Sequence, residues 1–437
     1  MCEFCTGNVK LEHSSANSPG SDSQAGSEKK TADDARSALS LDADLAKPPN
    51  ETDAKQSLLK KYGVETREVN DGQTEFFYRA GGHDNVVLRT ASDADSLAKA
   101  PDQLDKIVQQ RVDSIEKQFK VTIAKPGEFA TTAEVNDDDC KPVAGDKVYA
   151  RQGTLPVLFG LEEGLRQSQP SQFLAGGKEG IKIYLLDKQA APDFYGGRKV
   201  QGTYRFKSDN GKPVIYITPA GQEQPATSKD TLKPGDRNVA WITTHEIAHN
   251  SQSLQWGRET PENVAVALGW EKYQHKSGVT VFPFIEGKNG DLYFNGSDSC
   301  KTPTTWFSIH KTGWPLDANG LPVKSVAEAS KFTNEEVMDR AKVRPSTFYF
   351  SSPFEEMAEA ITSYRYSPES RAQLFKQSPK LYEITAEYDR KELADFYGKD
   401  WSWNAKMVRT PDGRVVPRTS DSVRQIDEFE KQLRAGG

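Results

Sequence analysis

Two histidines four residues apart, with a glutamate directly after the first, are the feature that most constrains this chain. They lie in the segment 237–255, whose apolar residues recur at helical spacing and which is followed by Gly257, a residue typical of helix ends. Side chains four residues apart share one face of a helix, one turn above each other. His245 and His249 can therefore reach the same metal ion, with Glu246 beside them.

The residue types at these positions indicate a particular chemistry. Imidazole nitrogens are common zinc ligands, and at its offset the carboxylate of Glu246 reaches the attacking water rather than the metal. Glu246 is therefore predicted to be the general base of a zinc-dependent hydrolysis. The chain has only 6 histidines, so the pattern arises by accident in roughly one of a couple of hundred such chains. The competing interpretation is a surface helix that carries the pattern by chance.

A catalytic zinc site needs a third protein ligand and one open position. The metzincin arrangement would require glycine and histidine where this chain has Gln252 and Gln255. A better candidate is Glu355, at the start of a predicted helix in which Glu359 shares its face. Glu355 is predicted to bind the zinc, and Glu359 to accept a hydrogen bond from a ligand histidine and fix its tautomer.

Other residues also qualify as the third ligand, and an acidic helix face turned to solvent would explain the glutamates near residue 355 equally simply. A helix predicted over 263–275 would bring two of the alternatives, Glu271 and His275, together on one face. The alternatives are Glu262, Glu271, His275, His310 and, by a shift of one position, Glu356.

The two motifs together, His-Glu-x-x-His and a distant Glu-x-x-Ala-Glu, resemble the gluzincin group of zinc peptidases, in particular the lethal-factor-type catalytic domain of bacterial toxins. The resemblance extends roughly from Leu155 to Phe396, and its specific part is the two motifs. It implies an α+β, zincin-like domain in which a mixed sheet packs on the motif helix. It also implies Zn2+ as cofactor and a peptide or protein as substrate.

The same resemblance implies roles for further residues. Glu355 would be a zinc ligand and Glu359 would support the site. Tyr349, six residues before Glu355, is the nearest match to a tyrosine that stabilises the transition state, although a core aromatic explains it equally well. The interval between His249 and Glu355 is longer than in compact gluzincins and implies an inserted subdomain.

The rest of the chain is divided by composition and periodicity. Residues 1–55 have almost no large apolar side chains and predict a disordered leader. A small α/β segment follows at 56–150, then the zincin-like domain at 151–400 with its insertion at about 277–334, and a C-terminal tail at 401–437. Hairpins are predicted at 75–89 and 199–218, a strand at 181–186, and helices at 102–119, 155–167, 335–343, 353–364, 368–375 and 379–396.

Several classes are excluded or left open by the same data. A dispersed net charge of -6 gives no basic patch for nucleic acid, and no run of about 18 apolar residues predicts a membrane span. The start of the chain lacks the apolar core of a secretory signal, which favours the cytoplasm or export by a route other than Sec. The cysteines leave a metal or redox pair (Cys2, Cys5) and a disulfide (Cys140, Cys300) open.

The predicted function is hydrolysis of peptide bonds by a zinc metallopeptidase. Two alternatives remain at this point. A zinc hydrolase acting on another amide bond would need the same residues, and a catalytically silent scaffold with this fold would be expected to carry a damaged motif. The sequence sets no oligomeric state.

Overall fold

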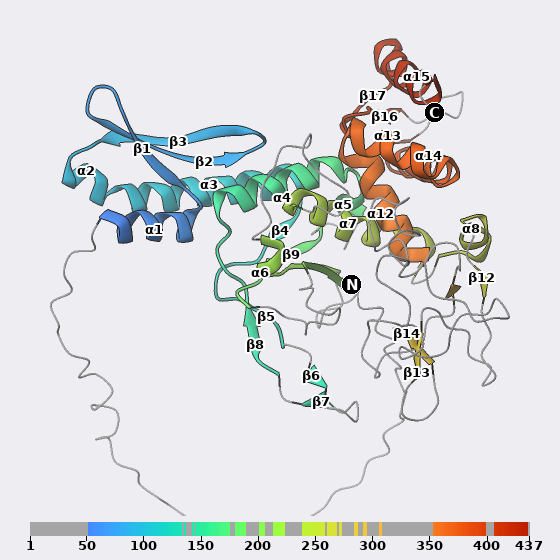
Figure 1. The fold of residues 1–437 in the computed structure, drawn as a ribbon, viewed down its shortest axis with the longest axis horizontal. Coiled ribbons are helices and arrows are strands. Elements are labelled where there is room, and N and C mark those ends of the chain that lie inside the picture. The colour runs from blue at the N-terminus through green and yellow to red at the C-terminus, as the bar shows by residue number, and fades with distance from the viewer. Residues whose placement is uncertain are drawn as a thin grey trace, which may run out of the picture.

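The computed structural model of the chain describes a defined set of residues, namely 51–132, 135–136, 142–143, 145–174, 180–188, 201–205, 213–222, 238–257, 260–268, 271–272, 284–286, 292–294, 306–307, 353–398 and 406–435. The predicted leader up to residue 50, the predicted helix at 335–343, Tyr349 and the four cysteines lie outside these residues. Helix α1 (Glu51–Tyr62) begins within the last five residues assigned to the leader. The described part is an α+β protein (Figure 1).

The N-terminal part is a three-stranded antiparallel sheet with helices beside it. Its strands are β1 (Glu65–Val69), β2 (Gln73–Ala80) and β3 (His83–Ala91), in the order β1-β2-β3. The predicted hairpin is confirmed, and its turn uses Gly81 and Gly82 at φ of 63° and 79°, which favour glycine. Helix α2 (Ala94–Ala98) follows, and α3 (Ala100–Phe119) confirms the helix predicted at 102–119.

A mixed sheet lies at the centre of the molecule. Its strands are β4 (Thr122–Ile123), β9 (Lys182–Leu185), β10 (Gly202–Arg205) and β11 (Val214–Ile217), in the order β10-β11-β9-β4. Strand β10 runs antiparallel to β11, whereas β11, β9 and β4 are parallel. The strand predicted at 181–186 and the two arms of the hairpin predicted at 199–218 are confirmed. Strand β4 comes from the segment predicted as a separate N-terminal part.

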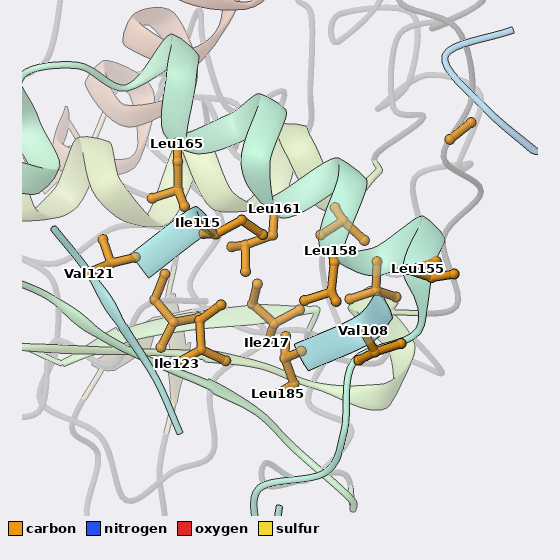
Figure 2. Packing of buried hydrophobic residues seen from close by; sticks show 14 of the residues in the cluster. Val108, Ile115, Val121, Ile123, Leu155, Leu158, Leu161, Leu165, Leu185 and Ile217 are labelled. Atoms are coloured by element: carbon orange, nitrogen blue, oxygen red, sulfur yellow. The ribbon is translucent and has the colours of Figure 1, made fainter. Parts of the chain in front are cut away.

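Alternate residues of the central strands face opposite sides of the sheet. Ile183, Leu185, Ile215 and Ile217 pack against α3, α4 (Leu155–Gln167) and α7 (Val239–Trp256), and Figure 2 shows the leucines of α4 pointing toward Leu185 and Ile217. The other face carries Tyr184, Leu186, Val214 and Tyr216, which pack with residues of β5 (Phe129–Thr132) and β8 (Lys147–Tyr149). The first cluster runs from Tyr62 to Ile247, so the predicted boundary at residue 150 does not separate two cores.

Helix α7 is buried along almost its whole length, from Val239 to Ser253. Its first turn is capped by Asn238, whose side chain accepts a hydrogen bond from the backbone N–H of Trp241 at 2.9 Å. Two glycines of α4 allow the close approach of that helix. A Cβ on Gly160 would lie 2.8 Å from Val239 Cβ, and one on Gly164 would lie 2.6 Å from Thr243 Cβ.

The C-terminal helices pack on the far side of α7. They are α12 (Pro353–Tyr366), α13 (Pro368–Gln377) and α14 (Pro379–Tyr397), which confirm the three predicted helices. Within the segment predicted as a C-terminal tail, strands β16 (Met407–Arg409) and β17 (Val415–Pro417) pair and are followed by α15 (Ser420–Ala435). Arg409 is almost fully buried and anchors this segment to α14.

A shorter set of elements completes the described chain. Helix α8 (Glu262–Ala267) ends at Ala267, and the helix predicted over 263–275 is wrong at residues 271–272, which form a strand. It buries a single side chain, Ala265, and the following Glu271–Lys272 (β12) pairs with Trp306–Phe307 (β15), a long-range contact that overrides local helical spacing. None of the described helices is long and apolar enough to cross a membrane. The remaining elements are α5 (Ser171–Leu174), α6 (Pro219–Gln222), β6 (Val135–Asn136), β7 (Pro142–Val143), β13 (Phe284–Glu286) and β14 (Leu292–Phe294).

A buried ion network joins the C-terminal segment to the helices. Asp389 of α14 pairs with Arg365 of α12 at 2.8 Å and with Arg409 of β16 at 3.0 Å. Arg365 also pairs with Glu392 and donates a hydrogen bond to Ser171 Oγ at 2.7 Å. Burial disfavours the charged form of Asp389, but Arg409 and Arg365 hold its pKa below the ordinary value.

Replacing Asp389 by asparagine is expected to lower the free energy of unfolding at neutral pH by about 3–5 kcal/mol, because two buried guanidinium groups lose their shared charge partner. A carboxyl group whose pKa is lowered in the folded state stabilises the protein above its unfolded pKa. This stabilisation is lost as the pH falls through the folded pKa. The difference between wild type and Asp389→Asn should therefore be full above about pH 4 and shrink in more acidic buffer. Urea unfolding across this range measures it.

Asp395→Asn is the matched control for this experiment, since Asp395 lies on the same helix and pairs with Lys391 at an exposed position. Its effect should stay within about 0.5 kcal/mol. Equal effects of the two substitutions would show that the network does not stabilise the fold.

Candidate metal centre

Helices α7 and α12 pack side by side and bring three metal-ligating side chains together. His245 and His249 extend from α7, and Glu355 extends from the first turn of α12. One ligand atom from each lies within 4.8 Å of the other two. Among the residues that the structure describes, this is the one group of three or more histidine, cysteine, aspartate or glutamate side chains with that geometry.

The three distances between the ligand atoms lie at or somewhat below the spacing expected around a zinc ion. Nε2 of His245 lies 3.0 Å from Nε2 of His249, and Oε2 of Glu355 lies 3.2 Å from the first and 3.4 Å from the second. Tetrahedral zinc with ligand bonds of 2.0–2.2 Å places its ligand atoms about 3.3–3.6 Å apart. A charge-assisted hydrogen bond between imidazolium and carboxylate would be nearer about 2.8 Å. Of the three distances, 3.4 Å lies within the zinc range, and 3.0 and 3.2 Å lie between that range and the length of a direct hydrogen bond.

The electrostatics of the group favour the ionised, ligating form of Glu355 but the protonated form of His245. Burial disfavours the carboxylate of Glu355, but the neighbouring His249 and His245 hold its pKa well below the ordinary value. Burial also lowers the pKa of His245, yet Glu359, Glu355 and Glu246 more than offset this and raise it. Glu355 is therefore ionised, and protons compete with a metal ion for His245.

Glu359 lies where the sequence predicted it, on the face of α12 that points toward the motif helix. Its Oε1 is 3.4 Å from Nδ1 of His245, the ring nitrogen turned away from the ligand group, and its side chain is fully buried. Glu356, the alternative by one position, is also fully buried but does not belong to the three-residue group. Between these two neighbours, the geometry favours Glu355 as the ligand.

Glu246 is buried, and its carboxylate lies against the first residue of strand β10. A Cβ built on Gly202 would be 2.7 Å from Oε1 of Glu246 and 2.7 Å from Cγ2 of Ile242. A side chain at this position would require Glu246 or Ile242 to shift. Gly202 thus leaves room for Glu246 beside the histidines.

The ring of His249 is held from several directions. Phe354 stacks on it with ring centroids 5.1 Å apart and planes 7° apart, and Tyr204 of β10 lies beyond at 6.5 Å. Nδ1 of His249 lies 3.1 Å from Oε1 of Gln252, whose Nε2 donates a hydrogen bond to the carbonyl of Phe354 at 2.9 Å. The Tyr204 hydroxyl donates a hydrogen bond to Oδ1 of Asn250 at 3.1 Å.

The other predicted site residues do not belong to the three-residue group or lie outside the described residues. Glu262 is exposed on α8 and is not part of the three-residue group. Glu271 lies in strand β12 rather than in a helix, so the predicted helical pairing with His275 is wrong. Tyr349, His275 and His310 lie outside the described residues, and the role of Tyr349 stays a prediction.

Three residues of the site were missed from the sequence: Gly202, Tyr204 and Gln252. Gly202 and Tyr204 are two residues apart on a strand, and this spacing places both on one face of the sheet. No local sequence signal shows that α7 covers that face. Gln252 lies three residues after His249, a helical spacing that brings two side chains together. That spacing was the available signal for Gln252.

Comparison with protein-family models, with curated proteins and with solved structures gave no match for this chain.

Gly202→Ala is expected to lower the free energy of unfolding by about 1–3 kcal/mol, because the new methyl group would overlap Glu246 and Ile242. Urea or thermal unfolding measures the change. Thr203→Ala is the matched control: it alters the next residue of the same strand, whose side chain is half-buried on the other face, and should change stability by no more than about 0.5 kcal/mol. A neutral Gly202→Ala would contradict the close packing of Glu246 on the strand.

Proposed function

We propose that this chain is a zinc-dependent peptidase with a zincin-like catalytic domain. His245, His249 and Glu355 hold the metal, Glu246 is the general base, and Glu359 orients His245. The observation that carries the proposal is the convergence of three buried ligand atoms at distances of 3.0, 3.2 and 3.4 Å, close to the spacing that tetrahedral zinc requires.

The donor set supports zinc over harder cations. Two imidazoles and one carboxylate are a frequent set in catalytic zinc sites, where one position is left for water or substrate. Magnesium and calcium instead prefer six or more oxygen ligands. A zinc ion held here would supply a Lewis acid that polarises a carbonyl group and acidifies water.

The chain's own residues would perform the proton transfers. Glu246 accepts a proton from the attacking water and passes it to the leaving amine. Its burial against Gly202 restricts the carboxylate to the neighbourhood of the two histidines. Glu359 keeps the imidazole of His245 turned so that Nε2 faces the ligand group.

An extended peptide is the substrate that the neighbouring strand favours. Among the strands that the structure describes, β10 is an edge of the central sheet, hydrogen-bonded to β11 on one side only. It begins at Gly202, directly beside the predicted base. An edge strand offers main-chain donors and acceptors that an extended peptide can pair with. This arrangement favours a peptide over a small amide, which would be held more completely in a closed pocket.

Glu246→Gln is expected to retain zinc and to lower peptide hydrolysis by about 10²–10⁴-fold, because the amide keeps the shape of the side chain but cannot accept the proton. A quenched peptide library measures hydrolysis, and metal analysis after dialysis measures zinc. Glu387→Gln, an exposed position on α14, should leave both unchanged. Full activity in Glu246→Gln would exclude it as the base.

The same assays separate the alternatives. A wild-type chain that binds zinc and cleaves other amides, but no peptide in the library, would point to a non-peptide hydrolase. Zinc binding without hydrolysis of either class would point to a catalytically silent protein with an intact metal centre.

Glu355→Gln is expected to weaken zinc binding markedly, since one of three protein ligands loses its charge while the packing of α12 is kept. Competition with a chromophoric chelator measures the dissociation constant, and far-ultraviolet circular dichroism checks the fold. Unchanged zinc affinity would move the third ligand to a residue outside the group described above.

A further inference from the structure

Gln252 occupies a position between the two helices that supply the metal ligands. It lies on α7, one turn after His249, and is fully buried. Its side-chain amide has two distinct ends: Oε1 lies 3.1 Å from Nδ1 of His249, and Nε2 lies 2.9 Å from the backbone oxygen of Phe354. Phe354 directly precedes Glu355. The amide therefore bridges one ligand histidine and the backbone beside the ligand glutamate.

The donor and acceptor roles in this bridge follow from chemistry. A backbone carbonyl can only accept a hydrogen bond, so the NH2 end of the Gln252 amide must face Phe354. The carbonyl end of the amide then faces His249, and it too can only accept. Nδ1 of His249 must therefore carry the hydrogen. A neutral imidazole protonated at Nδ1 has its lone pair at Nε2, the atom that lies 3.0 Å from His245 and 3.4 Å from Glu355.

We propose that Gln252 is a positioning residue that fixes His249 in the Nδ1–H tautomer, so that Nε2 is free to bind the metal. This inference rests on the proposed zinc site and adds a partner for the second histidine, which Glu359 does not reach in the described contacts. His245 and His249 would thus be oriented by different helices, His245 by a carboxylate on α12 and His249 by an amide on α7 itself. The two ligands would then differ in charge environment although their motif positions are equivalent.

Geometry and burial make the amide well suited to this role. Phe354 stacks on the imidazole of His249 and limits the tilt of the ring, whereas the hydrogen bond from Nδ1 sets the rotation within its plane. Since Gln252 is excluded from water, neither of its hydrogen bonds can be replaced by solvent without a change in packing. Loss of an outer partner of a metal-bound histidine typically weakens metal binding about 10–100-fold.

The test compares Gln252→Met, which keeps the length of the side chain without either hydrogen bond, with Gln252→Glu, whose carboxyl group can still accept from Nδ1. Two readouts are taken on the full chain: the 15N chemical shifts of the histidine rings in the metal-free protein, and the dissociation constant for Zn2+ alone. The His249 signals are identified by their absence in His249→Gln. Gln255→Met, a half-buried position on the same helix, is the matched control.

Wild type, Gln252→Glu and Gln255→Met are expected to show His249 protonated at Nδ1, and wild type and Gln255→Met are expected to bind Zn2+ with similar affinity. Gln252→Met should show a mixture of tautomers and bind Zn2+ about 10–100-fold more weakly. Gln252→Asn, one methylene too short to bridge the two groups, should behave like Gln252→Met and replaces it if that variant does not fold.

An unchanged tautomer or an unchanged Zn2+ dissociation constant in Gln252→Met, or in Gln252→Asn when it is the variant used, would overturn the role of Gln252. If the wild-type chain itself binds no Zn2+, the proposed function fails instead. The tautomers of the metal-free proteins would then still decide whether Gln252 orients His249.

Discussion

The arrangement of the described chain depends on the burial of helix α7, which carries polar side chains on faces that are all covered by protein. A polar group without a partner is costly in such a place, so the surrounding elements must supply hydrogen bonds. Asn250 donates to the backbone of Ser171 at 3.0 Å, and Ser251 shares a hydrogen bond of 2.7 Å with Tyr388. Gln252 bonds to Phe354, the residue before Glu355. Each of these partners comes from a different helix, and together they fix where those helices pack.

The close packing of α4 on the opposite side of α7 has a simpler origin. Gly160 and Gly164 have no side chains that would hold the helices apart. A Cβ built on Gly164 would lie 2.7 Å from the backbone oxygen of Ala240. Glycine within a helix costs about 1 kcal/mol relative to alanine. That cost is offset by the close helix contact that the glycines permit. The leucines of α4 and apolar residues of α7 thereby form one buried core with the central sheet.

Much of the fold could be predicted because its signals are local. Helices α3, α4, α7, α12, α13 and α14 were predicted from apolar spacing, and Glu355 from a second motif that the structure places beside the first. The predictions that missed an element or a residue concern segments whose structural partners are distant in sequence. Residues 271–272 pair as a strand with residues 306–307. The C-terminal segment is held by buried hydrogen bonds of Arg409, which no local sequence pattern predicts. Gly202 matters through its distance to Glu246 alone, which only the assembled structure defines.

The ion network at the end of α12 bears on the candidate metal centre through the rigidity of that helix. Glu355 lies in the first turn and Arg365 in the last, where Asp389 and Glu392 hold its guanidinium group. A buried ion pair contributes little net stability compared with apolar packing, but its geometry can select one arrangement among several. Glu355 and Glu356 are adjacent and both buried, so a rotation of α12 by one residue, about 100°, would exchange them. Such a rotation would also move Arg365 away from its two carboxylates, and the network thus favours the orientation in which Glu355 faces the histidines.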